Sequence, residues 1–378
     1  MAKEPILVVV FLRGGADGLN LISPTADVDY IAARPETMRV LRKGDEAGFR
    51  MSEQAADVDF RFHHRAKNLS ELFEAGELGV IHASGLTDGT RSHFDAEAKM
   101  ERASKSGTAG GWLGRWFASQ KIEGILPLLA VGYAAPDSVR GAHEVAVAQN
   151  LEDLILAQGY DLAPLVRQRL LQGFGQHPLI GAPIQRLVQL SEILENRPDA
   201  QDMAAGDYTP SVEYGGGDLA ESFKTIAQTI KMDLGLRVAT VDFGGWDTHE
   251  DQRYEFDELV ATLSENLMAF WKDLGNAQER VNVVVMSEFG RRLRSNTSGG
   301  TDHGYGNAMM VLGADVKGGK MFGEWPGLSN DALDDGTDLA ITTDYRHVLA
   351  EIMTGHMRTK NTDILFPDFR PRTLGLFG

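Results

Sequence analysis

A continuous apolar run near the start of the chain limits the fold more than any other sequence feature. Residues Ile6–Leu12 read ILVVVFL, and Arg13 and two glycines follow at once. A strand that is apolar on both faces must be covered on both faces, which is typical of a parallel strand between two layers of helices. The run therefore predicts an α/β sheet and disfavours a sheet with one face in water.

Similar apolar runs recur along the chain, with helical patterns between them. Three further strands are predicted at Gly79–Ile81, Leu236–Phe243 and Val281–Met286. The segment Gln252–Leu274 has apolar residues at 3.6-residue spacing and is predicted to be a crossover helix, as is the shorter segment Ala66–Ala75. Alternation of strands and helices predicts a three-layer α/β/α fold with a mainly parallel central sheet.

The middle of the chain has a different pattern. Residues 122–233 look largely helical, most clearly at Val139–Ala157 and Ile184–Leu194. We expect these residues to form a helical insertion or lid within a single domain that spans residues 1–378. Near the end, Asp344–Met353 is predicted to be a helix with Asp344 as its N-cap.

Charge and cysteine content exclude several classes of function. The chain has 37 basic and 54 acidic residues, a net charge of −17, which disfavours nucleic-acid binding because that binding neutralises phosphates with Lys and Arg. A small anionic substrate is compatible with this charge if a bound divalent metal supplies local positive charge. With no cysteine in the chain, any metal must be held by His, carboxylates and neutral oxygens. No apolar run approaches the roughly 18–20 residues that span a bilayer.

Polar residues follow each predicted strand, at the point where ligands bind in open α/β sheets. Ligands in such sheets bind at the carboxyl ends of the strands, so the loops that follow the strands should meet at one rim. Five loops carry a carboxylate, a histidine or another reactive group, namely Asp17, then Ser92 and His93, then Asp247 and His249, then Glu288 and Arg291, and finally Asp302 and His303.

Each of these residues also has a structural interpretation when taken alone. Asp17 lies in a glycine-rich turn and could simply cap it. Ser92 could be an N-cap, although the same position provides a positive field that favours an anionic substrate or an alkoxide. Glu288 directly follows a buried strand and needs a partner for its charge. The convergence of five loops favours a site, and His63 and His64 could reach the same rim.

Long motifs in these loops resemble a bacterial family known as domain of unknown function 1501. The resemblance covers nearly the whole chain, and that family is in turn similar to the superfamily of alkaline phosphatases, sulfatases and cofactor-independent phosphoglycerate mutases. The resemblance implies an alkaline phosphatase-like fold and metal-dependent chemistry. The motifs are LRGGADGLN (Leu12–Asn20), TRSHFDA (Thr90–Ala96), GGWDTH (Gly244–His249), SEFGRR (Ser287–Arg292) and GTDHGYGNAM (Gly300–Met309).

The resemblance also implies roles for individual residues. Asp17 matches a metal-binding Asp after the first strand, and Ser92 matches the nucleophile. Asp247 and His249 match an Asp/His metal-binding pair, spaced more closely than usual. His303 matches the final metal-binding His.

The chain departs from the superfamily pattern at one metal-binding pair. An Asp-His pair of the superfamily is replaced here by Glu288 and Phe289, so one imidazole is missing. Asp302 or His93 could substitute for it, or an arginine such as Arg291 could supply the positive charge. A single-metal site and a degenerate site are both consistent with this departure.

An intact site would hold one or two divalent ions, for which Zn, Mn, Mg and Ca all fit oxygen and imidazole ligands. One ion would be held by Asp247, His249 and His303, and a second by Asp17 and Glu288. Ser92 would form a covalent phospho- or sulfo-enzyme that water hydrolyses. Charge that develops in the reaction would be neutralised by Arg91, His93 and Arg291.

Three functions follow from this interpretation. The first is hydrolysis of a small anionic phosphate or sulfate ester, and the second is transfer of the same group by a transferase or mutase. The third is a catalytically degenerate binding or cell-envelope protein. The resemblance implies an exported or periplasmic protein, although the chain shows no twin-arginine leader and would be cytoplasmic if it is complete. The oligomeric state is left open.

Overall fold

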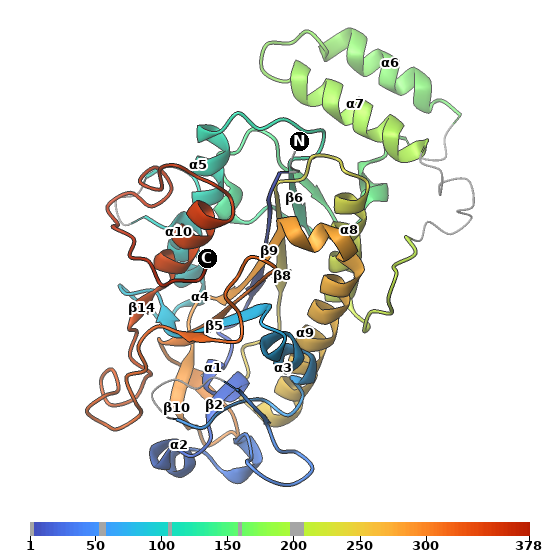
Figure 1. Ribbon diagram of the computed structural model, residues 1–378. Helices are drawn as coiled ribbons and strands as arrows, with labels where there is room; N and C mark the ends of the chain where they lie inside the picture. The colour runs from blue at the N-terminus through green and yellow to red at the C-terminus, as the bar shows by residue number, and fades with distance from the viewer. Residues whose placement is uncertain (1–3, 53–57, 105–107, 158–160, 197–207) are drawn as a thin grey trace.

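A large twisted sheet forms the centre of the protein (Figure 1). The computed structural model describes residues 4–52, 58–104, 108–157, 161–196 and 208–378. Its nine strands are β1 (Ile6–Leu12), β5 (Leu78–Gly85), β6 (Leu128–Val131), β7 (Ala146–Ala148), β8 (Val238–Phe243), β9 (Val281–Ser287), β12 (Asn307–Gly313), β13 (Met321–Phe322) and β14 (Thr343–Asp344). Their order is β13-β5-β12-β9-β1-β8-β6-β7, and β14 also pairs with β5.

The sheet is mainly parallel, as predicted. β1 lies at its centre and pairs in parallel with β8 on one side and β9 on the other. Among the strands of the described chain, β12 runs antiparallel to its neighbours β5 and β9. The four predicted strands are confirmed as β1, β5, β8 and β9.

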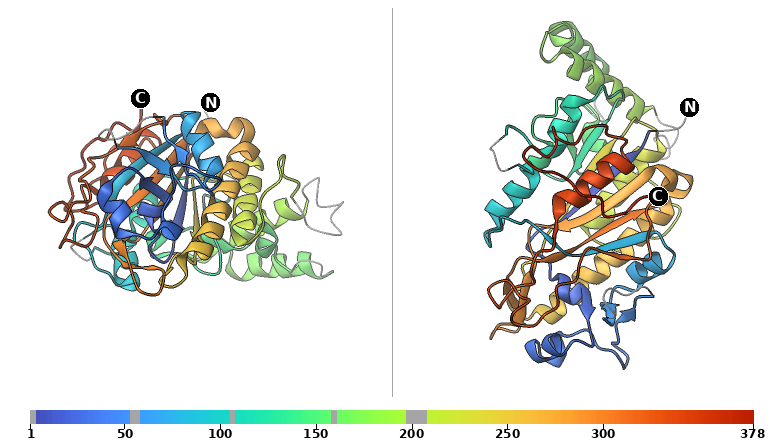
Figure 2. Two further views of the ribbon diagram at one scale, coloured as in Figure 1. Left: turned by 90° about the horizontal axis from the view of Figure 1, so that it is seen from below. Right: turned by 60° about the vertical axis from the view of Figure 1, so that its left-hand side comes forward.

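Helices cover both faces of this sheet. One face is covered by α3 (Lys67–Glu74), α8 (Asp218–Lys231) and α9 (Gln252–Leu274), and the other by α4 (His93–Arg102), α5 (Trp112–Ser119) and α10 (Tyr345–Gly355). The two layers are visible in Figure 2, where the sheet lies between them. The structure therefore confirms the three-layer α/β/α arrangement, and it confirms the predicted helices that correspond to α3, α9 and α10.

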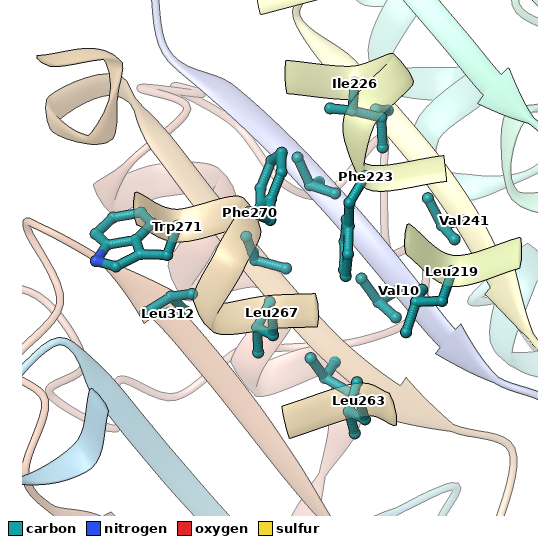
Figure 3. Close-up of a cluster of buried hydrophobic side chains, with 14 of the residues drawn as sticks. Val10, Leu219, Phe223, Ile226, Val241, Leu263, Leu267, Phe270, Trp271 and Leu312 are labelled. Atoms are coloured by element: carbon teal, nitrogen blue, oxygen red, sulfur yellow. The ribbon is translucent and has the colours of Figure 1, made fainter. Parts of the chain in front are cut away.

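Alternation of side chains along β1 explains why its sequence is apolar throughout. Val8 and Val10 point into one hydrophobic core, and Leu7 and Val9 point into the other. Figure 3 shows the first of these cores, where Val10 packs near Phe223 of α8 and residues of α9. Each face of β1 buries apolar surface, which stabilises the fold by roughly 1.5–3 kcal/mol for each large side chain.

Of the two clearest helices predicted within residues 122–233, Ile184–Leu194 is confirmed, because it lies within a helix at Gly181–Glu195. The predicted helix over Val139–Ala157 is wrong, because these residues contain η2 (Asp137–Val139, at its edge), the strand β7 and η3 (Leu151–Leu154). Short apolar runs do not distinguish a strand from a helix by spacing alone. Here pairing of β7 with β6 decides the outcome.

Two helices of this segment, α6 (Ala163–Phe174) and α7 (Gly181–Glu195), form a pair that projects from the body (Figure 1). Leu187 and Leu190 of α7 line a pocket with Leu126, which directly precedes the first residues of β6. The pair therefore lies at the amino end of the strands, away from β10, and it does not cover the rim where the candidate residues were expected.

Within the described residues, no helix is long and apolar enough to cross a membrane.

Smaller elements surround the opposite, carboxyl end of the strands (Figure 1). The smaller elements are α1 (Gly18–Leu21), β2 (Ile22–Pro24), α2 (Val28–Ala33), η1 (Glu36–Met38), β3 (Phe49–Arg50), β4 (Phe60–Phe62), β10 (Arg291–Ser295) and β11 (Thr301–His303). The short helix η5 (Gly275–Arg280) lies at the amino end instead, because it leads directly into β9.

Candidate active site

The loops that follow β1, β8 and β9 come together at the carboxyl end of the sheet. Gly14 has a φ of +117°, and a Cβ at this position would lie 2.5 Å from the backbone nitrogen of Asp247. Glycine is the residue that adopts such a conformation and permits so close an approach. The buried guanidinium of Arg291 donates to the carbonyl oxygens of Gly14, Gly15 and Trp246, and so holds the loops together.

Asp247 is the centre of a cluster of histidines at this rim. Its Oδ1 lies 3.0 Å from Nε2 of His303 and 3.0 Å from Nε2 of His249, and those two nitrogens are 2.9 Å apart. Its Oδ2 lies 3.4 Å from Nε2 of His93. The ligand-type atoms of His93, Asp247 and His303 all lie within 4.8 Å of one another. Four of the predicted site residues are therefore neighbours.

The rings of His303 and His93 each make a hydrogen bond through Nδ1, the nitrogen that points away from Asp247. These hydrogen bonds leave Nε2, which faces Asp247, with a lone pair. Nδ1 of His303 lies 2.8 Å from the carbonyl oxygen of Arg91, which can only accept, so Nδ1 carries the proton. Nδ1 of His93 lies 2.7 Å from Oε1 of Glu288 and donates to it in the same way. The buried Nε2 of His93 has no hydrogen-bond partner among the described residues. Metal-binding histidines commonly show this arrangement, with the remote nitrogen held by an oxygen.

The protonation states of Asp247 and His249 suit a role as metal ligands. Burial would raise the pKa of Asp247, but the neighbouring ring of His303 and the hydrogen bond and charge of Arg291 lower it to about 2. Burial and the charge of Arg291 lower the pKa of His249. The hydrogen bond from His93 to Glu288 raises the pKa of His93. Near neutral pH Asp247 is therefore an anion and His249 is neutral, which are the forms that bind a metal.

Glu288 lies behind this cluster and orients His93. Its carboxylate is fully buried and accepts from the backbone N–H of Gly14 at 2.8 Å and from the hydroxyl of Ser287 at 3.0 Å, as well as from His93. Burial would raise the pKa of Glu288, but these hydrogen bonds lower it overall. Glu288 is thus an ionised acceptor for the proton of His93.

Asp17 has a different environment from the one that sequence indicated. Both of its oxygens are engaged by Arg34, at 2.7 and 3.0 Å, and Nε2 of Gln252 donates to one of them at 2.7 Å. The pair is buried, and its contacts do not include Glu288, with which Asp17 was expected to share an ion. Arg34 and Gln252 carried no sequence signal, because they are distant in the chain and meet Asp17 only in the fold.

Two further residues support the rings from outside. Oδ1 of Asp302 lies 3.6 Å from Nδ1 of His249 and accepts from Asn296 at 3.2 Å, so Asp302 lies behind His249. The ring of Phe289, which replaces the missing imidazole, packs with its centroid 4.9 Å from that of His93 and 4.8 Å from that of His303. Phe289 therefore forms an apolar wall against which both imidazoles rest.

Ser92 immediately precedes His93 in the chain, at the start of a helix. It is exposed at the N-cap position of α4, immediately before His93, and its side chain makes no capping hydrogen bond within the described structure. Its backbone N–H donates to the hydroxyl of Thr90 at 3.2 Å. Arg91 pairs with the buried Asp338, a partner that sequence did not identify. The hydroxyl of Ser92 is thus available at a helix N-terminus.

Solved structures similar to this chain include a zinc complex, a member of the alkaline phosphatase superfamily and a sulfatase. The C-terminal periplasmic domain of EcEptC from Escherichia coli, in complex with Zn, matches at a TM-score of 0.38 and 8% identity over 83% of this chain and 74% of its own. A protein of the alkaline phosphatase superfamily from Vibrio parahaemolyticus matches at a TM-score of 0.38 and 10% identity, over 85% of this chain and 62% of its own. The PsFucS1 sulfatase from Pseudoalteromonas sp. matches at a TM-score of 0.36 and 12% identity, over 84% of this chain and 64% of its own.

No curated protein matches the sequence. The family model described as "Protein of unknown function (DUF1501)" matches residues 76–351, which is well over half of the chain and includes the candidate residues from Ser92 to His303. The chain therefore belongs to the DUF1501 family.

Proposed function

We propose that this protein is a metal-dependent hydrolase of small anionic phosphate or sulfate esters. One observation carries the proposal. His93 and His303 each hold the Nδ1 proton in a hydrogen bond and direct Nε2 toward Asp247, and Ser92 immediately precedes His93 at the exposed N-cap of α4. A metal-binding group and a nucleophile adjacent to it are the parts that this chemistry needs.

The side chains of the cluster fit a divalent metal. His93, Asp247 and His303 would hold it, with His249 next to them. Imidazole nitrogens favour Zn²⁺ over Mg²⁺, Ca²⁺ and Mn²⁺, which are better suited to oxygen ligands. Such an ion, when bound, stabilises negative charge on the oxygens of the ester in the transition state.

Ser92 would act as the nucleophile. Its oxygen forms a bond to phosphorus or sulfur while the bond to the ester oxygen breaks, and the proton of the serine hydroxyl passes to the leaving oxygen, which departs as the alcohol. Water then hydrolyses the seryl ester and regenerates the hydroxyl. The N-terminus of α4 and the neighbouring charge of Arg91 favour both the anionic substrate and the alkoxide.

The openness of the site favours hydrolysis over transfer. The side chains of Asp247 and His249 are 46% and 38% exposed, so water reaches the reacting group. A mutase or transferase must keep water out, and the helical pair of α6 and α7 lies at the other end of the sheet. Hydrolysis is therefore the better supported of the two reactions.

The test is turnover of an aryl phosphate and an aryl sulfate by the full chain after metal removal and reloading with Zn²⁺ or Mn²⁺. The wild type should hydrolyse at least one of them only when reloaded. Ser92→Ala should abolish turnover and retain the metal content. Undiminished turnover in Ser92→Ala would contradict the assignment of the nucleophile, and a metal-loaded wild type that is inactive on both esters would contradict the proposed function.

A further inference from the structure

A second group of metal-ligand side chains lies outside the candidate active site. His63 and His64 directly follow β4, and Asp257 lies in the second turn of α9. We propose that these three residues form a separate site for Zn²⁺ or a similar first-row divalent cation. Because none of the three belongs to the cluster around Asp247, this proposal does not depend on the proposed hydrolase activity.

The distances fit a metal better than they fit hydrogen bonds. Nε2 of His63 lies 3.3 Å from Oδ1 of Asp257, and Nε2 of His64 lies 3.3 Å from Oδ2 of the same carboxylate. Hydrogen bonds from nitrogen to oxygen are most often about 2.9–3.0 Å long. Ligands about 2.0–2.1 Å from a tetrahedral Zn²⁺ are about 3.3–3.4 Å apart. Each of the two separations, one to each oxygen of the carboxylate, therefore matches the distance between two ligands of a tetrahedral ion, and the ligand atoms of all three residues lie within 4.8 Å of one another.

The rings are held in place from several sides. The centroids of the two imidazoles are 4.2 Å apart, and the ring of Phe256 packs edge-on against His63 at 5.4 Å. The side chains of His63, His64 and Asp257 are only 5%, 18% and 19% exposed. The site is thus largely buried and has one partly open side, from which a fourth ligand such as water can approach.

The protonation of His63 is compatible with a ligand role. Burial, followed by the neighbouring His64, lowers the pKa of His63 to about 3, so this ring is neutral near pH 7. Its Nδ1 accepts a long contact of 3.3 Å from the backbone N–H of Arg65. A metal at Nε2 would require the ring proton on Nδ1, in place of this weak contact.

Two imidazoles and one carboxylate select the metal by their chemistry. Imidazole nitrogen is a ligand for Zn²⁺ and other first-row divalent ions and a poor one for Mg²⁺ and Ca²⁺. The bound ion would join the turn after β4 to α9, two segments that are about two hundred residues apart in the chain. We therefore expect a structural ion that raises the thermal stability of the protein.

The test uses the full chain with the substitution His303→Ala in every sample, so that the candidate active site does not retain its own metal. The protein is stripped with a chelator, loaded with Zn²⁺ and desalted, and its zinc content and melting temperature are measured. The His303→Ala protein should retain about one zinc per chain. Adding Asp257→Asn should remove that zinc and abolish the rise in melting temperature.

A neighbouring acid on the same helix provides the matched control. Glu258 carries the same charge, is exposed and pairs with Arg65, so Glu258→Gln should leave zinc content and the thermal shift unchanged. His64→Ala is the second variant if Asp257→Asn does not fold, as judged by circular dichroism. The proposal is overturned if the His303→Ala protein binds no zinc, or if the folded variant at position 257 or 64 retains the zinc and the thermal shift.

Discussion

Nδ1 of His93 lies 2.7 Å from Oε1 of Glu288, and this contact determines what the other nitrogen of the ring can do. Glu288 is buried, ionised and already bound by the backbone of Gly14, so it accepts the ring proton and keeps it. Nε2 is then left with a lone pair directed at Asp247, 3.4 Å from its Oδ2. Glu288 is therefore a positioning residue in this account and does not itself bind the metal.

Glu288→Gln should lower the pKa of His93 in the metal-free protein, because the hydrogen bond to Glu288 is the main reason that this pKa is raised. A raised pKa in the folded state means that protonated His93 stabilises the fold below its ordinary pKa. That stabilisation is lost as pH rises through the raised value. Titration of the histidine ring protons by NMR measures the shift. Asp302→Asn, a change at a residue next to His249, should leave the pKa of His93 unchanged. An unchanged pKa of His93 in Glu288→Gln would refute the link between His93 and Glu288.

Metal affinity should fall as pH falls through the raised pKa of His93, since a proton on Nε2 competes with the metal. Competition titration with a chromophoric zinc chelator over a series of pH values measures this dependence. In Glu288→Gln the midpoint should move to lower pH. The affinity at high pH should also drop, by about 10–100-fold, because the ring loses the group that orients it. A pH-independent affinity in the wild type would rule out His93 as a ligand.

Arg34→Met should destabilise the protein by about 3–5 kcal/mol, because it leaves the buried carboxylate of Asp17 without its cation. Arg42→Met is the comparison, since Arg42 pairs with Asp59 but is 56% exposed, and its loss should cost at most about 1 kcal/mol. Urea unfolding of the metal-free proteins measures both changes. Equal, small losses in the free energy of unfolding of the two variants would show that the buried pair of Arg34 and Asp17 stabilises the protein no more than the exposed pair.

Gly14→Ala should lower metal content and stability together. Its φ of +117° disfavours alanine, and the added Cβ would lie 2.5 Å from the backbone nitrogen of Asp247, so Asp247 must move. Gly244→Ala is a control near the same rim, because a Cβ there meets no atom of the described residues within 4 Å. Metal analysis and urea unfolding distinguish the two variants. Equal metal content in both would mean that the approach of the two loops does not position Asp247.

Much of the fold was predictable from sequence because the buried strands are unusually uniform. The run at Ile6–Leu12 is β1 with the predicted bounds, and the 3.6-residue pattern at Gln252–Leu274 is α9 with the predicted bounds. Both elements contact the core along their whole length, so the local pattern and the tertiary packing agree. β7 was missed because three residues at the edge of a sheet carry too little periodicity to identify a strand.

The candidate site was predictable as a set of residues but not as a set of contacts. The rule that ligands bind at the carboxyl ends of strands placed His93, Asp247 and His303 at one rim, and the structure brings them within 4.8 Å. The partner of Asp17 could not be predicted, because Arg34 lies in a loop of no special pattern and meets Asp17 only after folding. Ring protonation also depends on contacts across the fold, such as that of His93 with Glu288.

The most direct test of the central claim is the metal content of the purified, zinc-loaded full chain, compared among three proteins. The wild type is compared with a double variant, His93→Ala with His303→Ala, and with His177→Ala, which removes an exposed histidine outside both groups. The double variant should hold about one zinc per chain fewer than the wild type, and His177→Ala should hold as much as the wild type. A double variant that retains all of the wild-type zinc would contradict the central claim.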